Sequence, residues 1–218
     1  MLNLDFNQRI IIDTTKMQWE ASPAVGVKRK RLAFDAVESG HATSIVEFEA
    51  GSSFRRHEHP RGEEILVLSG VFSDELGDYH AGTYIRNPEG FTHAPFSQEG
   101  CEILVKLHQF QANDKAQVRV DYKVSAFTPV SDGFSMLTLH RFEAEHTALV
   151  RYSDSDKNIL PPSLAGEEIY VISGELCDEF GQYSEGCWLR SPQLSEPLIM
   201  VKTGTLLLVK RGHLSAHH

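Results

Sequence analysis

The chain has 218 residues, 41% of them hydrophobic, so it can form one large domain or two small ones with ordinary cores. Its net charge of −9 and the absence of a long basic run argue against direct binding of nucleic acid. It has no apolar run of about 18 residues and no signal-peptide pattern, so we expect a cytoplasmic protein that does not enter the membrane. Three cysteines without a Cys-x-x-Cys motif argue against a disulfide framework.

The predicted elements are all strands. A basic cluster at residues 28–31 stands where a strand should begin, and we interpret it as a solvated guard on an edge strand. Short runs rich in β-branched and aliphatic residues then alternate with Gly, Pro, Asp and Asn. This pattern predicts strands over residues 44–49, 64–68, 101–107, 148–152, 168–172 and 205–210. We therefore expect an all-β chain of sandwiches or barrels, with a polar connector at residues 109–125.

Three histidines and one glutamate have the spacing of a metal site. His57 and His59 are two residues apart, so on a strand their imidazoles point to one face, roughly 6.5–7 Å apart along the chain. Both can then converge on one ion with bonds of about 2.0–2.1 Å. Glu63 follows shortly after, and His93 lies on a distant strand. We predict that these four residues bind one divalent transition metal.

Two points at this site stay open in the sequence. Alternation along a regular strand places Glu63 beside the histidines and Glu64 on the other face, but a bulge at Pro60 and Gly62 would exchange them. Three nitrogens and one oxygen suit Zn, Fe, Mn, Ni or Cu, so the ligand set alone does not select the metal. The chain has no nucleophile elbow, P-loop or dinucleotide-binding glycine motif, which leaves triad hydrolases, P-loop NTPases and dinucleotide binders without support.

The second half of the chain repeats the first at an offset of 104 residues. Residues 62–70 match residues 166–174 at seven of nine positions, which predicts a duplicated domain divided into residues 1–112 and 113–218. The offset carries the four predicted ligands to Pro161, Ser163, Glu167 and Pro197. Because one carboxylate without an imidazole is a poor site for a transition metal, we expect one metal per chain, in the first half.

The predicted ligands belong to two longer motifs, Gly51-x5-His57-x-His59-x3-Glu63-x6-Gly70 and Gly82-x5-Pro88-x-Gly90-x2-His93. These resemble the two motifs of the cupin superfamily, except that Ser97 stands where the family often has Asn. Gly62-Glu63-Glu64, Asp74-Glu75 and Gly100-Cys101 resemble the cupin domain of the anti-sigma factor ChrR group. The resemblance implies two tandem cupin jelly-roll barrels. It also implies zinc as the metal, while the ligand set itself leaves Fe, Mn and Ni as alternatives.

The resemblance first implies a regulatory or stress-sensing module that responds to reactive oxygen. Sigma-factor binding does not transfer, because the His-x3-Cys-x2-Cys element of the anti-sigma domain is missing from this sequence. The second hypothesis is an enzyme, a mononuclear metal-dependent dioxygenase that acts on a small oxygenated or aromatic molecule. A structural metal beside an interaction surface is the third. A small-molecule ligand, a protein partner and a homodimer all stay open.

Three more residues are candidates for the pocket. Alternation through residues 101–107 turns Cys101 inward, where its thiol is either a redox group near the metal or a small buried hydrophobe. Tyr84 and Arg86, on the strand before His93, are candidates for polar residues of the pocket.

Overall fold

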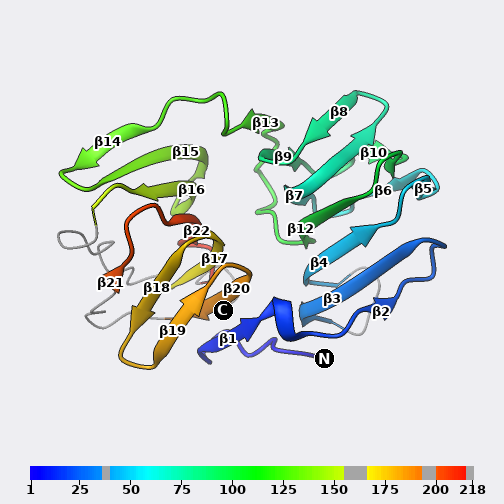
Figure 1. The fold of residues 1–218 in the computed structure, drawn as a ribbon. Helices are drawn as coiled ribbons and strands as arrows, with labels where there is room; N and C mark the ends of the chain where they lie inside the picture. The colour runs from blue at the N-terminus through cyan, green and yellow to red at the C-terminus, as the bar shows by residue number, and fades with distance from the viewer. Residues whose placement is uncertain (36–39, 155–165, 193–199, 215–218) are drawn as a thin grey trace. The chain divides into compact units, whose positions relative to one another are not determined.

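The computed structural model describes residues 1–35, 40–154, 166–192 and 200–214. Within these residues every regular element is a strand, apart from a 3-10 turn, η1 (Thr14–Lys16), which confirms the predicted all-β class (Figure 1). Over the same ranges no helix is both long and apolar enough to cross a bilayer. Cys101, Cys177 and Cys187 are free.

The chain forms two compact units. The first contains Met1–Leu4 and Met17–Val124, and the second contains Asp5–Lys16 and Ser125–His218. These units differ from the expected division into residues 1–112 and 113–218. The N-terminal segment joins the second unit because β1 (Ile10–Asp13) pairs with β20 (Cys187–Ser191). The first unit extends beyond residue 112 because β13 (Val118–Asp121), inside the predicted connector, pairs with β9 (Thr83–Asn87).

One large sheet carries most of the first unit. Its central path follows the order β13-β9-β7-β12-β4-β3-β2. The five strands after β9 are β7 (Glu63–Asp74), β12 (Cys101–Leu107), β4 (Ala42–Phe48), β3 (Val27–Phe34) and β2 (Glu20–Ala21). Shorter strands extend this sheet: β5 (Ser52–Ser53), β8 (Gly77–His80) and β11 (Phe96–Ser97). A separate two-stranded sheet pairs β6 (His57–Glu58) with β10 (Thr92–His93).

The second unit has the same plan. Its larger sheet follows the order β1-β20-β17-β22-β16-β15-β14, with β17 (Glu167–Ser173), β22 (Leu206–Arg211), β16 (Glu145–Tyr152), β15 (Phe134–Phe142) and β14 (Thr128–Ser131). A three-stranded sheet contains β18 (Glu175–Asp178), β19 (Gly181–Ser184) and β21 (Met200–Val201). Glu63 lies opposite Leu107 in the first unit and Glu167 lies opposite Arg211 in the second, so the 104-residue offset is kept in the strand register.

Each unit has its own apolar core. In the first, Phe48, Ile65, Phe72, Ile85 and Ile103 belong to one cluster of buried side chains. In the second, the corresponding cluster is built from side chains such as Phe134, Val150, Ile169, Val171 and Leu207. Burying one such side chain stabilises the fold by about 1.5–3 kcal/mol, so each cluster contributes to the stability of its own unit.

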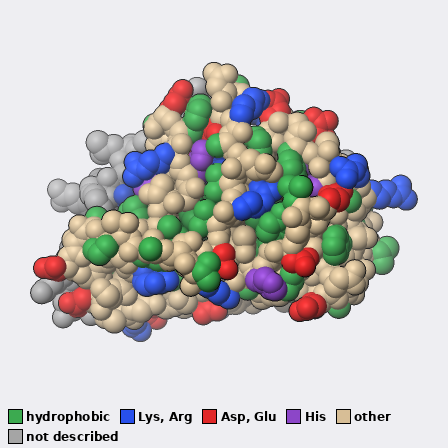
Figure 2. All heavy atoms as spheres, turned by 90° about the horizontal axis from the view of Figure 1, so that it is seen from above, with side chains coloured by type: hydrophobic (Ala, Val, Ile, Leu, Met, Phe, Trp, Pro, Cys, Tyr) green, Lys and Arg blue, Asp and Glu red, His purple; other side chains and the backbone are tan. Residues whose placement is uncertain are grey.

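The basic cluster at residues 28–31 does not lie on an edge strand, although its interpretation as a solvated guard requires one. Strand β3 has a neighbour on each side, because it pairs with β4 along its length and with β2 at Lys28 and Arg29. Alternation sends Lys28 and Lys30 to one face and Arg29 and Arg31 to the other. On the face of the molecule drawn in Figure 2, acidic and basic side chains are intermixed with apolar ones rather than gathered by charge.

Candidate metal centre

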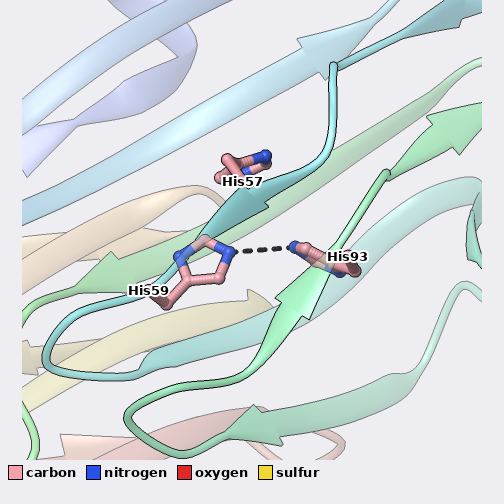
Figure 3. Close-up of side chains that lie close together, drawn as sticks. All are labelled: His57, His59 and His93. Atoms are coloured by element: carbon pink, nitrogen blue, oxygen red, sulfur yellow. Dashed lines mark hydrogen bonds between the residues drawn. The ribbon is translucent and has the colours of Figure 1, made fainter.

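Two short antiparallel strands bring the histidines together. In the pair formed by β6 and β10, His57 lies directly opposite His93. Side chains in such opposite positions share one face, with Cβ atoms about 4.5–5.5 Å apart. His59 lies just after β6, where its backbone N–H donates to the carbonyl of Phe91 at 3.1 Å. One ring nitrogen of each histidine lies within 4.8 Å of the other two, and Figure 3 shows the three rings gathered at this point.

The ring nitrogens have the spacing that a shared ion requires. The Nε2 atoms of His59 and His93 are 2.9 Å apart (Figure 3). Two nitrogens bound to one ion at about 2.0–2.1 Å lie about 3 Å from each other. The Nδ1 atom of His57 lies 2.8 Å from the backbone carbonyl of Arg55. Because a carbonyl can only accept a hydrogen bond, the ring proton stays on Nδ1 and Nε2 is the electron-pair donor.

Glu63 stands beside the histidines because the chain turns sharply just before it. Gly62 has a φ of +75°, in the left-handed region, and a Cβ atom there would come within 2.4 Å of the Phe110 ring. After this turn, one carboxylate oxygen of Glu63 lies 3.5 Å from Nε2 of His59 and 3.5 Å from Nε2 of His93. The structure therefore brings all four predicted ligands to one place.

Glu64 points to the opposite face of β7. Its carboxylate accepts a hydrogen bond from the Tyr84 hydroxyl at 2.6 Å and lies 3.5 Å from Nε of Arg86. Arg86 also pairs with Asp114 at 2.7 Å and stacks on the Phe110 ring. The placement of Tyr84 and Arg86 in the pocket is therefore corrected, because both belong to a buried polar cluster on the other side of the sheet.

Two side chains that the sequence analysis did not select support the ligands. Nδ1 of His93 lies 3.2 Å from the buried carboxylate of Asp74, and the Asn87 amide donates to Glu63 at 3.0 Å. Arg119 in turn donates to the Asn87 side-chain oxygen at 2.5 Å. Such partners fix the orientation and tautomer of metal ligands. In the sequence, Asp74 belongs to the Asp74-Glu75 pair that resembles the ChrR group, and the offset of 104 residues repeats it as Asp178, but neither signal gives it a role beside a metal ligand.

The pKa values of the residues at the site favour the binding of a cation. Burial lowers the pKa of His59 to about 4, and the neighbouring imidazoles of His93 and His57 act in the same direction. His59 is therefore neutral near pH 7, with a lone pair to donate. Burial alone would raise the pKa of Asp74, but hydrogen bonds from His93, the Leu76 amide and Tyr79 bring it below its ordinary value. A carboxylate with a lowered pKa stays charged. It therefore favours the His93 tautomer that has its proton on Nδ1 and a lone pair on Nε2.

The site opens into a cavity of about 520 Å³ inside the first unit. His57, His59 and Glu63 form part of its wall. Most of the remaining lining is apolar, with aromatic and aliphatic side chains that include Phe34, Val46, Phe48, Phe54, Phe72, Ile103, Val105 and Leu107. The polar exceptions away from the ligands are Arg29, Arg31, Ser44, Glu58 and His108. A pocket with mainly apolar walls and a few placed polar groups is typical of a small-molecule site.

Cys101 is not part of this cavity. It is buried in the apolar core of the first unit, among residues such as Phe48 and Phe72. Burial raises the pKa of its thiol to about 11, so almost none of it is thiolate near neutral pH. Because the thiolate is the reactive form, the placement of Cys101 as a pocket or redox residue is corrected to that of a small buried hydrophobe.

His108 is a pocket residue that the sequence analysis passed over. It lines the cavity with a φ of +59°, in the left-handed region where side chains other than glycine are uncommon. The second unit has Gly212 at the corresponding position, with a φ of +74°. The first unit thus keeps an imidazole where the backbone favours glycine. Burial and the nearby Arg61 lower its pKa.

The second unit keeps the acidic part of the site and adds an arginine. Glu167 and Asp178 correspond to Glu63 and Asp74, while Pro161, Ser163 and Pro197 lie outside the described residues. Arg9, from the N-terminal segment, forms an ion pair with Asp178. Together with Glu167 these residues surround a cavity of only about 20 Å³. Arg211 donates to Glu167 at 2.8 Å, so both carboxylates have a guanidinium partner.

Solved structures share this fold at low sequence identity. A "putative dioxygenase" from Nostoc punctiforme PCC 73102 aligns with a TM-score of 0.76 at 16% identity, over 96% of this chain and 84% of that one. The protein Ylba from E. coli aligns with a TM-score of 0.69 at 11% identity, over 97% and 92%. The bacterial pirin YhhW from Escherichia coli, in complex with nickel(II), aligns with a TM-score of 0.67 at 13% identity, over 94% and 98%. At these identities the likeness establishes the fold alone.

No curated protein matches the chain. The family model described as the ChrR cupin-like domain matches it twice, over residues 7–111 and 115–215. These two matches agree with the internal repeat and confirm the predicted arrangement of two tandem cupin barrels. With both copies matched along nearly its whole length, the chain belongs to the family of ChrR cupin-like domains.

Proposed function

We propose that the first unit is a mononuclear metal-dependent dioxygenase that acts on a small oxygenated or aromatic molecule. The observation that carries this proposal is the cavity of about 520 Å³, because His57, His59 and Glu63 belong to its wall. A structural metal site is closed by its protein ligands, whereas a catalytic site keeps a position open to substrate. A cavity in this size range admits a molecule with an aromatic ring.

The ligands in this proposal are His57, His59, Glu63 and His93. A divalent metal held there would supply a Lewis-acidic centre where a substrate oxygen and O2 come together. The other tasks fall to the chain itself. Asp74 and the Arg55 carbonyl hold two imidazoles in the donor tautomer, and Asn87 orients the carboxylate of Glu63. The mainly apolar wall favours a substrate with an apolar body.

The proposed chemistry determines which metal ion we expect at this site. Oxygenase chemistry calls for a redox-active ion, so within this proposal Fe(II) is the first candidate, with Mn and Ni as alternatives that suit the same ligands. Zinc, which the resemblance to the ChrR group implied, has no redox chemistry of its own and fits a structural or regulatory site. Elemental analysis of protein purified without chelator or added metal separates the two.

A second candidate function is a regulatory module that binds a small molecule without turning it over. Membership of the ChrR cupin-like family favours it. Sensing of reactive oxygen through Cys101 has no support from the buried thiol, so the metal itself would be the sensing group. A protein partner and a homodimer stay predictions. In this function the same cavity is the effector site, and loss of metal is the signal.

Oxygen uptake by the iron-loaded protein tests the proposal. We expect consumption of O2 with at least one member of a panel of small aromatic ketones and diketones, and none with His59→Ala, which removes a ligand. His80→Ala, on an exposed strand position, is the matched control and should retain both iron and activity. Stoichiometric zinc, with ligand binding but no O2 uptake, would favour the regulatory function. Full metal content in His59→Ala would refute the ligand set itself.

A further inference from the structure

We infer that His108 donates a hydrogen bond to a neutral oxygen, carbonyl or hydroxyl, of a small molecule bound in the cavity of the first unit. The inference rests on the proposed function only in placing a substrate in this cavity beside a metal, and it adds the polar group by which that substrate is recognised. His108 lines the cavity and is 7% exposed. In a mainly apolar pocket, a few placed polar groups determine the orientation and identity of the ligand.

The backbone of His108 directs its side chain into the cavity. Successive residues of a strand point to opposite faces, but Leu107, the last residue of β12, and His108 both line the cavity. The alternation ends because His108 has a φ of +59°, which residues other than glycine adopt at a cost. Strained residues of this kind cluster at ligand sites.

The second unit does not allow a side chain at the corresponding position. Gly212 has the same left-handed conformation, and a Cβ atom there would come within 2.0 Å of the Ala144 carbonyl oxygen. The first unit therefore has room for an imidazole at a turn where the second unit has room for glycine alone. This difference accompanies the cavity, which is about 520 Å³ in the first unit and about 20 Å³ in the second.

The imidazole of His108 has hydrogen-bonding capacity that the protein does not use. Neither ring nitrogen forms a hydrogen bond with a described residue, and Nδ1 is fully buried, so Nε2 is the nitrogen that can meet a ligand. A buried N–H without an acceptor is rarer than a lone pair without a donor. The neutral ring therefore has its proton on Nε2, where a ligand oxygen can accept it in a hydrogen bond.

His108 is anchored next to the metal ligands without being one of them. Its backbone N–H donates at 3.0 Å to the carbonyl of Gly62, the turn that sets Glu63 beside the histidines. In the described part of the chain, the histidines with ring nitrogens within 4.8 Å of one another are His57, His59 and His93. A molecule in the cavity can thus meet the metal with one group and His108 with another.

The rest of the lining favours a neutral oxygen over an anionic one. Of its two arginines, Arg31 forms an ion pair with Glu20, and Arg29 has partners of its own within the protein. Its acidic residues are Glu58 and Glu63. An anionic group would therefore lose its hydration without gaining an unpaired cation from the lining, whereas a neutral oxygen loses much less and recovers it through one hydrogen bond.

The test is anaerobic calorimetry of the metal-loaded protein with two matched pairs, acetophenone with α-methylstyrene and 1-phenylethanol with isopropylbenzene. The members of a pair share one skeleton and differ in the oxygen, so the ratio of their affinities measures the hydrogen bond apart from apolar burial. Oxygen gas is excluded so that binding is measured apart from turnover. We expect the oxygen-containing member of at least one pair to bind about fivefold or more tightly.

Three variants assign this preference to the imidazole. His108→Gly introduces the residue of the second unit, and the affinity ratio should fall about fivefold. His108→Asn keeps a side-chain donor and tolerates the left-handed conformation, so it should restore part of the ratio. Glu143→Gly is the matched control, because Glu143 has a φ of +50° on an exposed turn outside the cavity lining and its replacement should leave the ratio as in the wild type.

Two results would overturn the inference: no preference for oxygen in either pair, or a preference that His108→Gly leaves unchanged, which assigns the oxygen to the metal. Melting temperatures of the variants, measured alongside, exclude unfolding as the cause of a loss. Failure of the proposed function gives a different result, because a preference that depends on His108 without O2 uptake removes the oxygenase and keeps the binding group. Uptake of O2 with an affinity ratio that does not depend on His108 keeps the oxygenase and removes this role.

Discussion

Replacing Asp74 with Asn should weaken metal binding without unfolding the protein. One oxygen of Asp74 accepts hydrogen bonds from the Leu76 amide at 2.8 Å and the Tyr79 hydroxyl at 3.1 Å, and the other faces Nδ1 of His93 at 3.2 Å. The Leu76 amide can only donate, so in the variant it keeps the remaining side-chain oxygen on its own side. The new NH2 group then faces His93 and forces Nδ1 to accept, which moves the ring proton to Nε2.

The size of the effect follows from that wrong tautomer. Loss of such a supporting partner costs about 10–100-fold in metal affinity, or about 1.4–2.8 kcal/mol. Because Asp74→Asn removes a charge and also reverses the hydrogen bond, we expect the upper part of this range. Asp78→Asn is the matched control, since it makes the same chemical change in the same hairpin, where Asp78 accepts from the Ser73 hydroxyl at 2.6 Å.

The assay is competition with a chelating dye on metal-free protein, with thermal unfolding of the same samples. If Asp74→Asn binds zinc or cobalt within about threefold of Asp78→Asn, Asp74 does not orient His93 and the reasoning fails. If the metal-free variant melts well below the wild type before any metal is added, the loss of affinity belongs to the fold instead. The expected result is an unfolding midpoint close to that of Asp78→Asn with a clearly weaker metal affinity.

Three further predictions concern residues around the two barrels. With a pKa of about 11, Cys101 is about one part in a thousand thiolate at pH 8, and this fraction grows as pH rises. Iodoacetamide should therefore label the half-buried Cys177 first. Rapid labelling of Cys101 at pH 8, measured by mass spectrometry, would contradict its burial. Arg9→Met should destabilise the protein by about 1–3 kcal/mol, seen as a melting temperature several degrees lower, whereas the exposed Lys16→Met should not. His108→Gly should relieve about 1–2 kcal/mol of backbone strain. This gain offsets the loss of the buried imidazole, so the variant should stay close to wild type in denaturant melts while losing affinity for a ligand of the cavity. A large destabilisation would make His108 a structural residue.

The metal ligands could be predicted because their chemistry is local. His57 and His59 lie close in sequence, and imidazoles at that spacing on a strand have one obvious use. Asp74 could not be found this way, because its role depends on the pairing that sets it against His93, far along the chain. A buried Asp at the end of a strand reads like any turn residue until that contact is known.

Alternation failed where both faces of a strand are buried. Every residue of β9 is buried, so Tyr84 and Arg86 could not be assigned to the pocket or to the far side from their order alone. The interpretation of the basic cluster of β3 differs from the structure for a related reason. The sequence shows four similar cations, and only the cavity on one face distinguishes Arg29 and Arg31 from Lys28 and Lys30. The alternation of side chains along a strand separates its two faces, but it does not show which residues or which cavity each face contacts.

The two units stabilise their corresponding buried acids in different ways. A buried carboxylate is costly unless a cation lies beside it. In the first unit Glu63 and Asp74 are arranged around histidines that can hold a metal. In the second unit the corresponding acids have Arg211 and Arg9 as partners, and Arg9 reaches Asp178 because β1 pairs with β20. The N-terminal segment therefore does more than complete a sheet, because it also brings Arg9 to the buried carboxylate of Asp178 in the second unit.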